Sequence, residues 1–334
     1  MSAPDRRLLV VSNRLPVVLE KTAASWELKP SSGGLVTALA PVLSLRGGLW
    51  IGWPGLALEP GGGWEQVMEA GLPDRGYELA PVLLSEEEVH GFYEGFSNAV
   101  LWPLFHDLVS SCDFQPAYWY AYLEANRKFA EQVVARSRPD DFVWVHDYQL
   151  IHVAEMVRER AADRQIGFFL HIPFPPLDLF LKLPWRAQIL GALLAYDLLG
   201  FQTQRDRRNF LNCLENLLPE VEITDGQVAE VRVGGRTVRV GDFPIGIDAG
   251  SFAERAASTE VEQRTAELRR RFEPRELIVG VDRLDYTKGL PERLMAYRDA
   301  LERLFVLDDL PAWQPSRNFI SQLALPPKHH LADP

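Results

Sequence analysis

The sequence predicts an α/β protein built on a parallel sheet, and two observations lead to this fold class. Short apolar runs alternate with longer segments whose apolar residues recur at helical spacing, which is the pattern of strands connected by helices. Polar side chains directly follow several of the apolar runs, and in open parallel sheets the carboxyl ends of the strands face the ligand. The chain has 334 residues, enough for two domains of roughly 100–200 residues each.

The composition argues against several classes of protein. Acidic residues outnumber basic ones, 46 to 35, and the net charge of −11 disfavours a nucleic-acid partner, which requires a basic surface. The two cysteines form neither a disulfide framework nor a metal pattern, so we expect no metal and no other cofactor. No apolar run approaches the ~20 residues of a membrane span, and no signal peptide is visible. We therefore expect a cytoplasmic protein without a membrane partner.

The first third of the chain contains three expected strands and two candidate binding elements. The strands are at residues 8–12, 48–54 and 77–83. Arg14 follows the first strand, and residues 17–19 and 26–28 are expected to form a hairpin. Gly33 and Gly34 then open a helix, where glycine lets another backbone or a ligand approach the first free N–H groups closely. The alternative is a plain helix cap with a tight turn.

A segment at residues 92–106 is rich in aromatic and amide side chains and has no clean period. Aromatic walls beside hydrogen-bonding groups suit a sugar, because a sugar has partly apolar faces and a rim of hydroxyls. The alternative is an aromatic cluster in the core. We favour the core for Phe92 and Phe105, and the sugar site for Tyr93 and Trp102.

Two further strands end in polar residues that could share a site. The expected strands are at residues 142–145, 166–170 and 198–201, and the helices are at residues 119–135, 149–157, 185–196 and 206–218. Asp147 and His171 follow the first two of these strands, as Arg14 follows the first strand of the chain. Each alone has an ordinary explanation, such as a helix cap or a satisfied core histidine. Three polar groups at the same topological position nevertheless predict a common site.

The end of the N-terminal region is expected to be structural. A basic cluster is interpreted as a solvated face rather than a site: Arg205, Arg207 and Arg208. Residues 228–240 predict a hairpin with a Gly-Gly turn, and residues 243–248 predict a closing strand and linker. We place the domain boundary there, which gives domains at residues 1–248 and 249–334.

The second region contains one segment with recognisable chemistry. An apolar run at residues 277–280 predicts a buried strand, and a helical pattern begins at Pro291. Arg283 and Lys288 then lie on the connecting loop, beside the free N–H groups of a helix N-terminus. This arrangement can hold a phosphate or diphosphate. The alternative is a surface loop in which Arg283 pairs with a neighbouring aspartate.

Several motifs together resemble the trehalose-6-phosphate synthases, the retaining transferases of glycosyltransferase family 20. They occur in the family's order over nearly the whole chain, at residues 12–16, 33–35, 50–53, 92–98, 101–103, 145–148, 171–175, 200–203, 244–248 and 282–289. The resemblance implies the GT-B fold, which has two Rossmann-like domains facing across a cleft. It also implies two ligands: the acceptor glucose 6-phosphate on the N-terminal domain and a nucleotide-glucose donor, usually UDP-glucose, on the C-terminal domain.

On the acceptor side, the resemblance implies roles for five residues. Arg14 corresponds to a phosphate contact, and Tyr93 and Trp102 correspond to the pair that binds the acceptor. Asp147 corresponds to the carboxylate near the reacting glucose. Lys328 stands where the family has an arginine, and a lysine keeps the charge but loses the bidentate fork.

On the donor side, the resemblance implies a site without metal. Gly33 and Gly34 correspond to backbone donors near the diphosphate, and His171 corresponds to a hydrogen-bond donor to the glucose. Arg283 and Lys288 correspond to the pair that neutralises the departing nucleoside diphosphate, and would do so electrostatically as a divalent ion does elsewhere. The implied catalytic set is Asp147, His171, Arg283 and Lys288. We favour a front-face route in which the leaving phosphate takes the acceptor proton; the alternative is a double displacement through a carboxylate.

The chain departs from the family in its second region, because the family's donor domain continues well beyond the last expected strand at residues 318–325. We therefore expect a truncated member with a complete N-terminal Rossmann-like domain and only part of the donor domain, through gene disruption or an incomplete gene model. Three functions stay open: an active synthase of trehalose biosynthesis, an inactive remnant that binds sugar phosphate or a full-length homologue, and a glucosyltransferase with another phosphorylated acceptor. The sequence determines neither the donor nucleotide (UDP, GDP or ADP) nor the oligomeric state, and a homo-oligomer stays an alternative.

Overall fold

The computed structural model describes residues 6–22, 25–31, 33–58, 61–70, 76–273 and 279–304. The chain divides into two compact units, residues 1–256 and residues 257–334, and each unit is described by itself. The assignment of residues 1–248 to acceptor binding and of residues 249–334 to donor binding stays a prediction, because the division reflects packing and not ligands.

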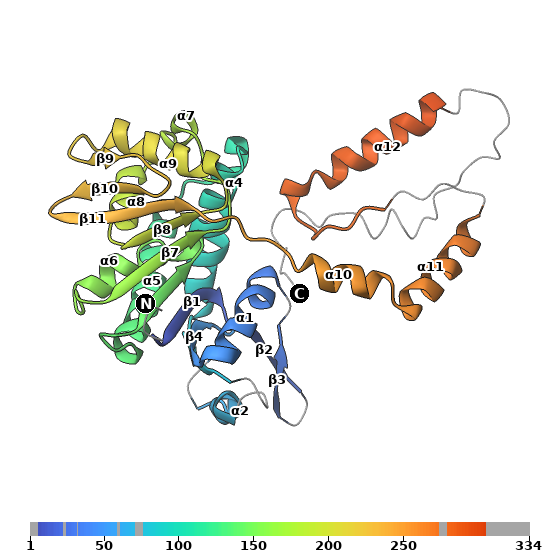
Figure 1. Ribbon diagram of the computed structural model, residues 1–334, viewed down its shortest axis with the longest axis horizontal. Coiled ribbons are helices and arrows are strands. Elements are labelled where there is room, and N and C mark those ends of the chain that lie inside the picture. Colours follow the sequence, from blue (N-terminus) through green and yellow to red (C-terminus); the bar gives the residue numbers. More distant parts are fainter. Residues whose placement is uncertain are drawn as a thin grey trace. The chain divides into compact units, whose positions relative to one another are not determined.

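A sheet of nine strands forms the centre of the first unit (Figure 1). Its strands are β1 (Leu8–Arg14), β4 (Gly48–Trp53), β5 (Glu78–Pro81), β6 (Phe142–His146), β7 (Gln165–Leu170), β8 (Leu198–Phe201), β9 (Glu222–Thr224), β10 (Ala229–Val233) and β11 (Arg236–Asp242). They follow the order β5-β4-β1-β6-β7-β8-β11-β10-β9. Every pairing from β5 to β11 is parallel, whereas β10 is antiparallel to both neighbours. The structure thus confirms the predicted parallel sheet.

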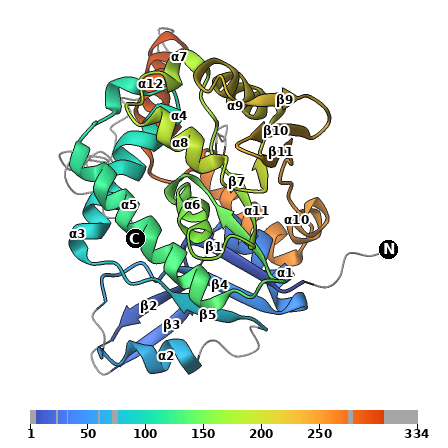
Figure 2. The same ribbon diagram turned by 90° about the vertical axis from the view of Figure 1, so that its left-hand side faces the viewer.

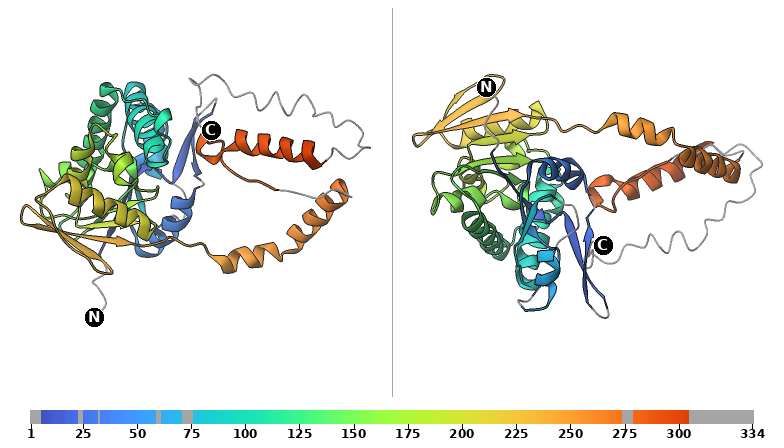
Figure 3. Two further views of the ribbon diagram at one scale, coloured as in Figure 1. Left: turned by 90° about the horizontal axis from the view of Figure 1, so that it is seen from above. Right: turned by 60° about the horizontal axis from the view of Figure 1, so that its bottom comes forward.

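The expected hairpin is also present, as β2 (Val17–Lys21) paired with β3 (Trp26–Pro30). This antiparallel pair stands apart from the main sheet (Figure 3). In its register, Val17 at the start of β2 lies opposite Pro30 at the end of β3. The hairpin therefore carries the chain from the end of β1 to the start of the next helix.

Helices connect the strands, and α5, α6 and α8 lie on the same side of the sheet (Figure 2). The helices of the first unit are α1 (Gly34–Arg46), α2 (Trp64–Ala70), α3 (Glu86–Glu88), η1 (Val89–Leu101), α4 (Trp102–Phe105), η2 (Val109–Ser111), α5 (Pro116–Arg136), η3 (Tyr148–Leu150), α6 (Val153–Arg158), α7 (Leu177–Phe180), α8 (Arg186–Leu193), α9 (Gln204–Leu217) and α10 (Ala249–Ala256). Among the helices that the structure describes, none combines the length and the apolar character that a bilayer crossing requires.

Alternate residues of β1 enter two different cores, because successive side chains of a strand point to opposite faces. Leu9 and Val11 belong to the larger core, which includes residues of α5, α6 and α8. Leu8 and Val10 belong to the smaller core, which includes residues of α1. Both faces of β1 are therefore covered, and this explains why its sequence is a continuous apolar run.

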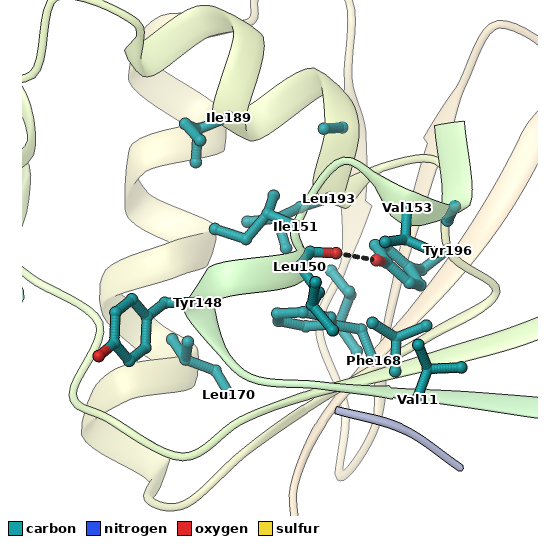
Figure 4. Packing of buried hydrophobic residues seen from close by; sticks show 14 of the residues in the cluster. Val11, Tyr148, Leu150, Ile151, Val153, Phe168, Leu170, Ile189, Leu193 and Tyr196 are labelled. Atoms are coloured by element: carbon teal, nitrogen blue, oxygen red, sulfur yellow. Dashed lines mark hydrogen bonds between the residues drawn. The ribbon is translucent and has the colours of Figure 1, made fainter. Parts of the chain in front are cut away.

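Close packing in the larger core surrounds a small number of satisfied polar groups (Figure 4). The hydroxyl of Tyr196 donates a hydrogen bond of 2.9 Å to the carbonyl oxygen of Leu150, so a fully buried phenol keeps a partner. The hydroxyl of Tyr122 donates to the carbonyl of Tyr148 at 2.7 Å and accepts from the N–H of Ile151 at 3.2 Å. These bonds secure the turn that follows β6.

The aromatic segment forms an unusual helix, which explains its lack of a clean period. The element η1 is a π-helix and α4 continues it. Because a π-helix bonds residue i to residue i+5, its buried positions do not recur at the α-helical spacing. Phe92 and Phe105 are buried, as the sequence predicts, and Tyr93 and Trp102 are only partly buried.

Two expectations for the first unit are wrong. Residues 243–248 form no strand, because the register with β8 ends at Asp242 and Phe201, and after one more bond, from the N–H of Phe243 to the carbonyl of Phe201, Pro244 has no N–H to donate. Arg207 is not part of a solvated face: its side chain is buried and pairs with Asp225 at 2.6 Å and with Asp242 at 3.4 Å. The reason is helical spacing, since Arg207 shares a face of α9 with the buried Phe210.

The second unit is described through α11 (Thr259–Phe272), the short turn η4 (Tyr286–Lys288) and α12 (Leu290–Leu304). The helix predicted to begin at Pro291 is confirmed as α12. The buried strand expected at residues 277–280 is not seen where the structure describes it: Val279 and Gly280 are irregular, and Val279 is 81% exposed. A strand needs a neighbour to pair with, and no strand is present among the described residues of this unit. The strand expected at residues 318–325, like Lys328, lies outside the described residues.

We expect that Tyr122→Phe lowers the free energy of unfolding by about 1–3 kcal/mol, because it leaves a buried carbonyl and a buried N–H without their partner. Tyr120→Phe is the matched control, since Tyr120 lies on the same helix and is 70% exposed. Its effect should stay within about 0.5 kcal/mol. Urea unfolding of the three proteins measures the difference, and equal losses from both substitutions would contradict this account of the turn.

Candidate functional site

Three of the residues singled out in the sequence lie at one edge of the sheet. Arg14 is the last residue of β1, Asp147 directly follows β6, and His171 directly follows β7. The strand β6 pairs with β1 on one side and with β7 on the other, so these three strand ends are adjacent. Parallel pairing therefore places a guanidinium, a carboxylate and an imidazole at the edge where open sheets of this type hold ligands.

Asp147 ties the ends of β6 and β7 together. Its Oδ1 accepts hydrogen bonds from the backbone N–H of Tyr148 at 3.1 Å and of His171 at 3.2 Å. Among the described residues, Oδ2 has no partner. The backbone of Asp147 has a φ of 73°, a conformation that costs a non-glycine residue of order 1–3 kcal/mol and is concentrated at functional sites. Burial raises the pKa of the carboxyl to about 6, although both amide hydrogen bonds oppose the shift.

A pair of histidines lies beside this carboxylate. Nδ1 of His146 is 3.1 Å from Nε2 of His171, and the two rings meet edge to edge, with a centroid distance of 5.3 Å and an angle of 29° between their planes. His146 is buried and His171 is partly exposed. Burial lowers the pKa of both rings, in His171 to about 4, so both are neutral at pH 7.

Arg14 is held by aromatic rings and not by a carboxylate. Its guanidinium carbon lies 4.2 Å from the ring centroid of Trp53 and 5.4 Å from that of Tyr93. A Cβ on Gly55 would collide with the guanidinium, and Gly55 also has a φ of 94° that favours glycine. Within the described part of the chain Arg14 has no ion pair. Its charge is therefore oriented by stacking and stays available for an anion.

The other predicted aromatic residue faces the turn after β6. The ring of Trp102 packs against His106 at 4.1 Å and against Tyr148 at 5.7 Å, measured between centroids. The hydroxyl of Tyr148 donates to Oδ1 of Asn98 at 2.9 Å. Because Tyr148 directly follows Asp147, this contact joins the aromatic helix to the carboxylate.

Gly33 and Gly34 lie at the N-terminus of α1, and both are exposed. The first backbone bond inside this helix runs from the N–H of Thr37 to the carbonyl of Gly33, so the preceding amides are not used within the helix. A Cβ on either glycine would meet nothing within 4 Å. The absence of side chains therefore leaves open space in front of a positively polarised helix end.

In the second unit, Arg283 precedes the capped turn η4 and Lys288 is its last residue. Asp285 Oδ1 accepts from the N–H of Thr287 at 2.9 Å, which starts η4, and Gly289 ends it with a φ of 60°. Arg283 makes only a long contact with Asp285, at 3.8 Å, and its side chain is exposed. Among the described residues Lys288 has no ion pair. Both cations are therefore open to an anionic ligand.

A groove of about 450 Å³ opens beside the histidine pair in the first unit. It is lined by Leu35, Leu39, Phe142, Trp144, His146, Gly167, Phe168, Phe169, His171, Leu198, Gly200, Phe243 and Ile245. The lining is almost entirely apolar, apart from the two imidazoles at one end. No group of three or more histidine, cysteine, aspartate or glutamate side chains that could hold a metal occurs in the described residues.

Sequence reasoning did not identify four residues of this site: Trp53, Gly55, Asn98 and His146. Trp53 and His146 could have been found from strand alternation, since each ends a strand whose neighbouring end carries a predicted site residue. Gly55 and Asn98 had no such signal, because their contacts depend on segments that are distant in sequence.

Comparison with known proteins gives a consistent result. The sequence profile of glycosyltransferase family 20 matches residues 6–310. A trehalose-6-phosphate synthase of Mycobacterium sp. (strain JLS) is 44% identical over 306 residues, covering 89% of this chain and 62% of the relative. One from Mycolicibacterium vanbaalenii is 41% identical over 346 aligned positions, covering 99% and 68%. The chain thus spans about two thirds or less of the length of the curated relatives it matches.

Solved structures show the same likeness. A UDP-forming α,α-trehalose-phosphate synthase from Burkholderia xenovorans, in complex with glucose-6-phosphate, has a TM-score of 0.74 and 34% identity. A structure from E. coli bound with UDP-2-fluoro glucose has a TM-score of 0.72 and 36% identity. Each comparison covers 89% of this chain, with 62% and 61% of the respective neighbours. The expected α/β fold of the GT-B type is confirmed.

The raised pKa of Asp147 predicts a pH-dependent stability difference between the wild type and Asp147→Asn. Between about pH 4 and pH 6 the folded wild type keeps a proton that the unfolded chain has lost, so its stability falls as the pH rises through this interval. The asparagine does not titrate and can accept the same amide hydrogen bonds. The free energy of unfolding of the variant should therefore increase relative to wild type from pH 4 to pH 6.

Denaturant unfolding at pH 4, 5, 6 and 7 measures this trend. The histidine pair changes the stability with pH in the opposite direction, but it does so in both proteins and therefore cancels in the difference. Asp163→Asn is the control, because Asp163 is an exposed residue paired with Arg164. A difference between Asp147→Asn and wild type that stays constant over the whole interval would contradict the assigned burial of the carboxylate.

Proposed function

The chain belongs to glycosyltransferase family 20, and from this premise we propose that it transfers glucose from UDP-glucose to glucose 6-phosphate with retention, forming α,α-trehalose 6-phosphate. One observation carries the proposal: Arg14 presents a guanidinium, stacked on Trp53 and without a carboxylate partner among the residues that the structure describes, at the sheet edge that holds Asp147 and His171. A phosphate suits this group because a guanidinium binds two of its oxygens at once. The neighbour from Burkholderia xenovorans is a complex with glucose-6-phosphate, which supports this choice of ligand.

The remaining residues supply complementary chemistry. Tyr93 and Trp102 offer aromatic surfaces for the acceptor sugar, and the free oxygen of Asp147 can accept from a sugar hydroxyl. In the transfer, the bond between the anomeric carbon and the diphosphate oxygen breaks while the acceptor hydroxyl bonds to that carbon. The proton of the hydroxyl passes to the leaving phosphate. Arg283 and Lys288 stabilise the charge that grows on this phosphate.

A second candidate function is acceptor binding without transfer. The chain spans only 62% of the Mycobacterium relative, and the second unit contributes two described helices and one turn. In this case the residues of the first unit would bind a sugar phosphate while the donor would not be held. A third candidate, transfer to another phosphorylated acceptor, uses the same phosphate contact.

Purified protein supplied with UDP-glucose and glucose 6-phosphate should release UDP in proportion to the acceptor present. The same assay with glycerol 3-phosphate tests the third candidate, and GDP-glucose and ADP-glucose test the donor. Calorimetry separates the second candidate, because heat of binding with glucose 6-phosphate but none with UDP-glucose would identify an acceptor-binding remnant. Absence of both turnover and acceptor binding would exclude the proposed function.

Arg14→Ala should weaken the binding of glucose 6-phosphate on the order of 10- to 100-fold, because a charge-assisted hydrogen bond contributes about 1.5–3 kcal/mol. Arg14→Lys should recover part of this loss, since it keeps the charge but not the fork. Arg232→Ala is the control, because Arg232 is exposed on β10 and pairs with Glu230 at 3.2 Å. Titration calorimetry measures all four proteins. A wild-type affinity in Arg14→Ala would assign the phosphate to another residue.

Arg283→Ala and Lys288→Ala should each lower kcat on the order of 100-fold with a smaller change in KM, because they act on charge that develops in the transition state. Arg298→Ala on the adjacent helix α12 is the control; Arg298 pairs with Asp299 at the surface. Steady-state kinetics with UDP-glucose measures the split between kcat and KM. A loss confined to KM would indicate ground-state donor binding instead.

A further inference from the structure

The histidine pair at the sheet edge contains a buried member for which the proposed chemistry gives no role. His146 ends β6, and its side chain is 1% exposed, whereas His171 after β7 is partly exposed. Their rings meet edge to edge at an angle of 29° between the planes, and Nδ1 of His146 lies 3.1 Å from Nε2 of His171. A hydrogen bond of this kind holds one proton between the two nitrogens, and either ring could donate it.

The proton count of the pair is fixed by its surroundings. The ring of Trp144 lies 4.6 Å from that of His146, and the ring of Phe169 lies 4.7 Å from that of His171, measured between centroids. This apolar wall disfavours an imidazolium, and burial lowers the pKa of both histidines. Each ring is therefore neutral at pH 7 and carries one N–H. Only two arrangements of the two protons keep the hydrogen bond.

The second nitrogen of His146 decides between the two arrangements. Its Nε2 is sealed from solvent and has no hydrogen-bond partner in the described part of the chain. If His171 were the donor, the proton of His146 would be on Nε2. This would leave a buried N–H without an acceptor, which is rarer in proteins than a buried lone pair without a donor. If His146 donates through Nδ1, only a lone pair is left unsatisfied at Nε2.

We propose that His146 is a positioning residue that fixes the tautomer of His171, so that His171 accepts at Nε2 and presents an N–H donor at Nδ1 to a hydroxyl of the bound sugar. Nδ1 of His171 has no partner among the described residues and is not among the sealed atoms. A hydroxyl oxygen accepts from such a donor. The sugar as the recipient of this N–H rests on the proposed function, whereas the tautomer itself does not.

This assignment has a consequence for proton transfer in the proposed reaction. In the assigned tautomer the only lone pair of the His171 ring is at Nε2, and it is already occupied by the N–H of His146. His171 is therefore a hydrogen-bond donor and has no free site at which to accept the proton of the attacking hydroxyl. The leaving phosphate is left to take that proton, which agrees with a front-face transfer.

Nitrogen NMR of the whole chain, labelled with ¹⁵N in its seven histidines, tests the tautomers directly. Long-range proton–nitrogen correlations distinguish a protonated Nδ1 from a protonated Nε2. We expect both His146 and His171 of the ligand-free wild type to carry the proton on Nδ1 at pH 7, with His146→Asn and His171→Asn used to assign the signals. A proton on Nε2 of His171, or a mixture of tautomers in that ring, would overturn the proposal.

Variants of His146 then connect the tautomer with binding. His146→Phe keeps a flat ring beside Trp144 but removes the donor, and should shift His171 toward protonation at Nε2 and lower kcat/KM for the nucleotide sugar about 3- to 10-fold. His146→Asn places an amide N–H near the former Nδ1 and should restore activity to within about threefold. His90→Phe is the control, because His90 is exposed and pairs with Glu94.

The outcomes separate this inference from the proposed function. If wild-type protein shows the assigned tautomers but no transfer, the tautomer assignment stands and the proposed function fails. If His146→Phe loses activity while the tautomer of His171 is unchanged, or if His146→Asn is as impaired as His146→Phe, then His146 acts only through packing and the proposal is wrong. The wild-type spectrum decides the tautomers even if His146→Phe does not fold.

Discussion

The hydrogen bonds from two backbone amides to one carboxylate oxygen of Asp147 are the constraint on which this sheet edge depends. They join the turn after β6 to the start of the turn after β7, so the carboxylate and His171 cannot move independently. The hydroxyl of Tyr122 also holds the turn after β6, through hydrogen bonds with the carbonyl of Tyr148 and the N–H of Ile151. Asp147 thus combines a strained backbone, a buried carboxylate and hydrogen bonds that connect two strand ends. The site is rigid, but the strain and the burial lower the local stability.

The polar groups of the site are held by apolar surfaces. Arg14 is oriented by the faces of Trp53 and Tyr93, and the two imidazoles lie against Trp144 and Phe169. This matters because a cation fixed by stacking keeps its hydrogen-bond donors free, whereas one fixed by a carboxylate would present a compensated charge to a ligand. Aromatic contacts therefore orient the guanidinium, and its N–H groups stay available to bind a ligand.

Much of the fold could be predicted from the sequence, because parallel strands buried on both faces leave long apolar runs and their order places Arg14, Asp147 and His171 at one edge. Other features depend on contacts that no local pattern encodes. The π-helix removes the periodicity on which helix prediction relies, and the two aspartates that pair with the buried Arg207 are distant from it in sequence. The pairing of His146 with His171 likewise appears only when two strand ends are brought together.

Gly55 shows that a residue without a side chain can determine where a charged group lies. The space that its missing side chain leaves is filled by the guanidinium of Arg14, and its left-handed backbone excludes most replacements on conformational grounds as well. A side chain at this position would displace the end of the Arg14 side chain from the place that it occupies against Trp53. The position of the guanidinium at this end of the sheet is therefore under steric control as well as the control of ring stacking, and the proposed binding of glucose 6-phosphate depends on both.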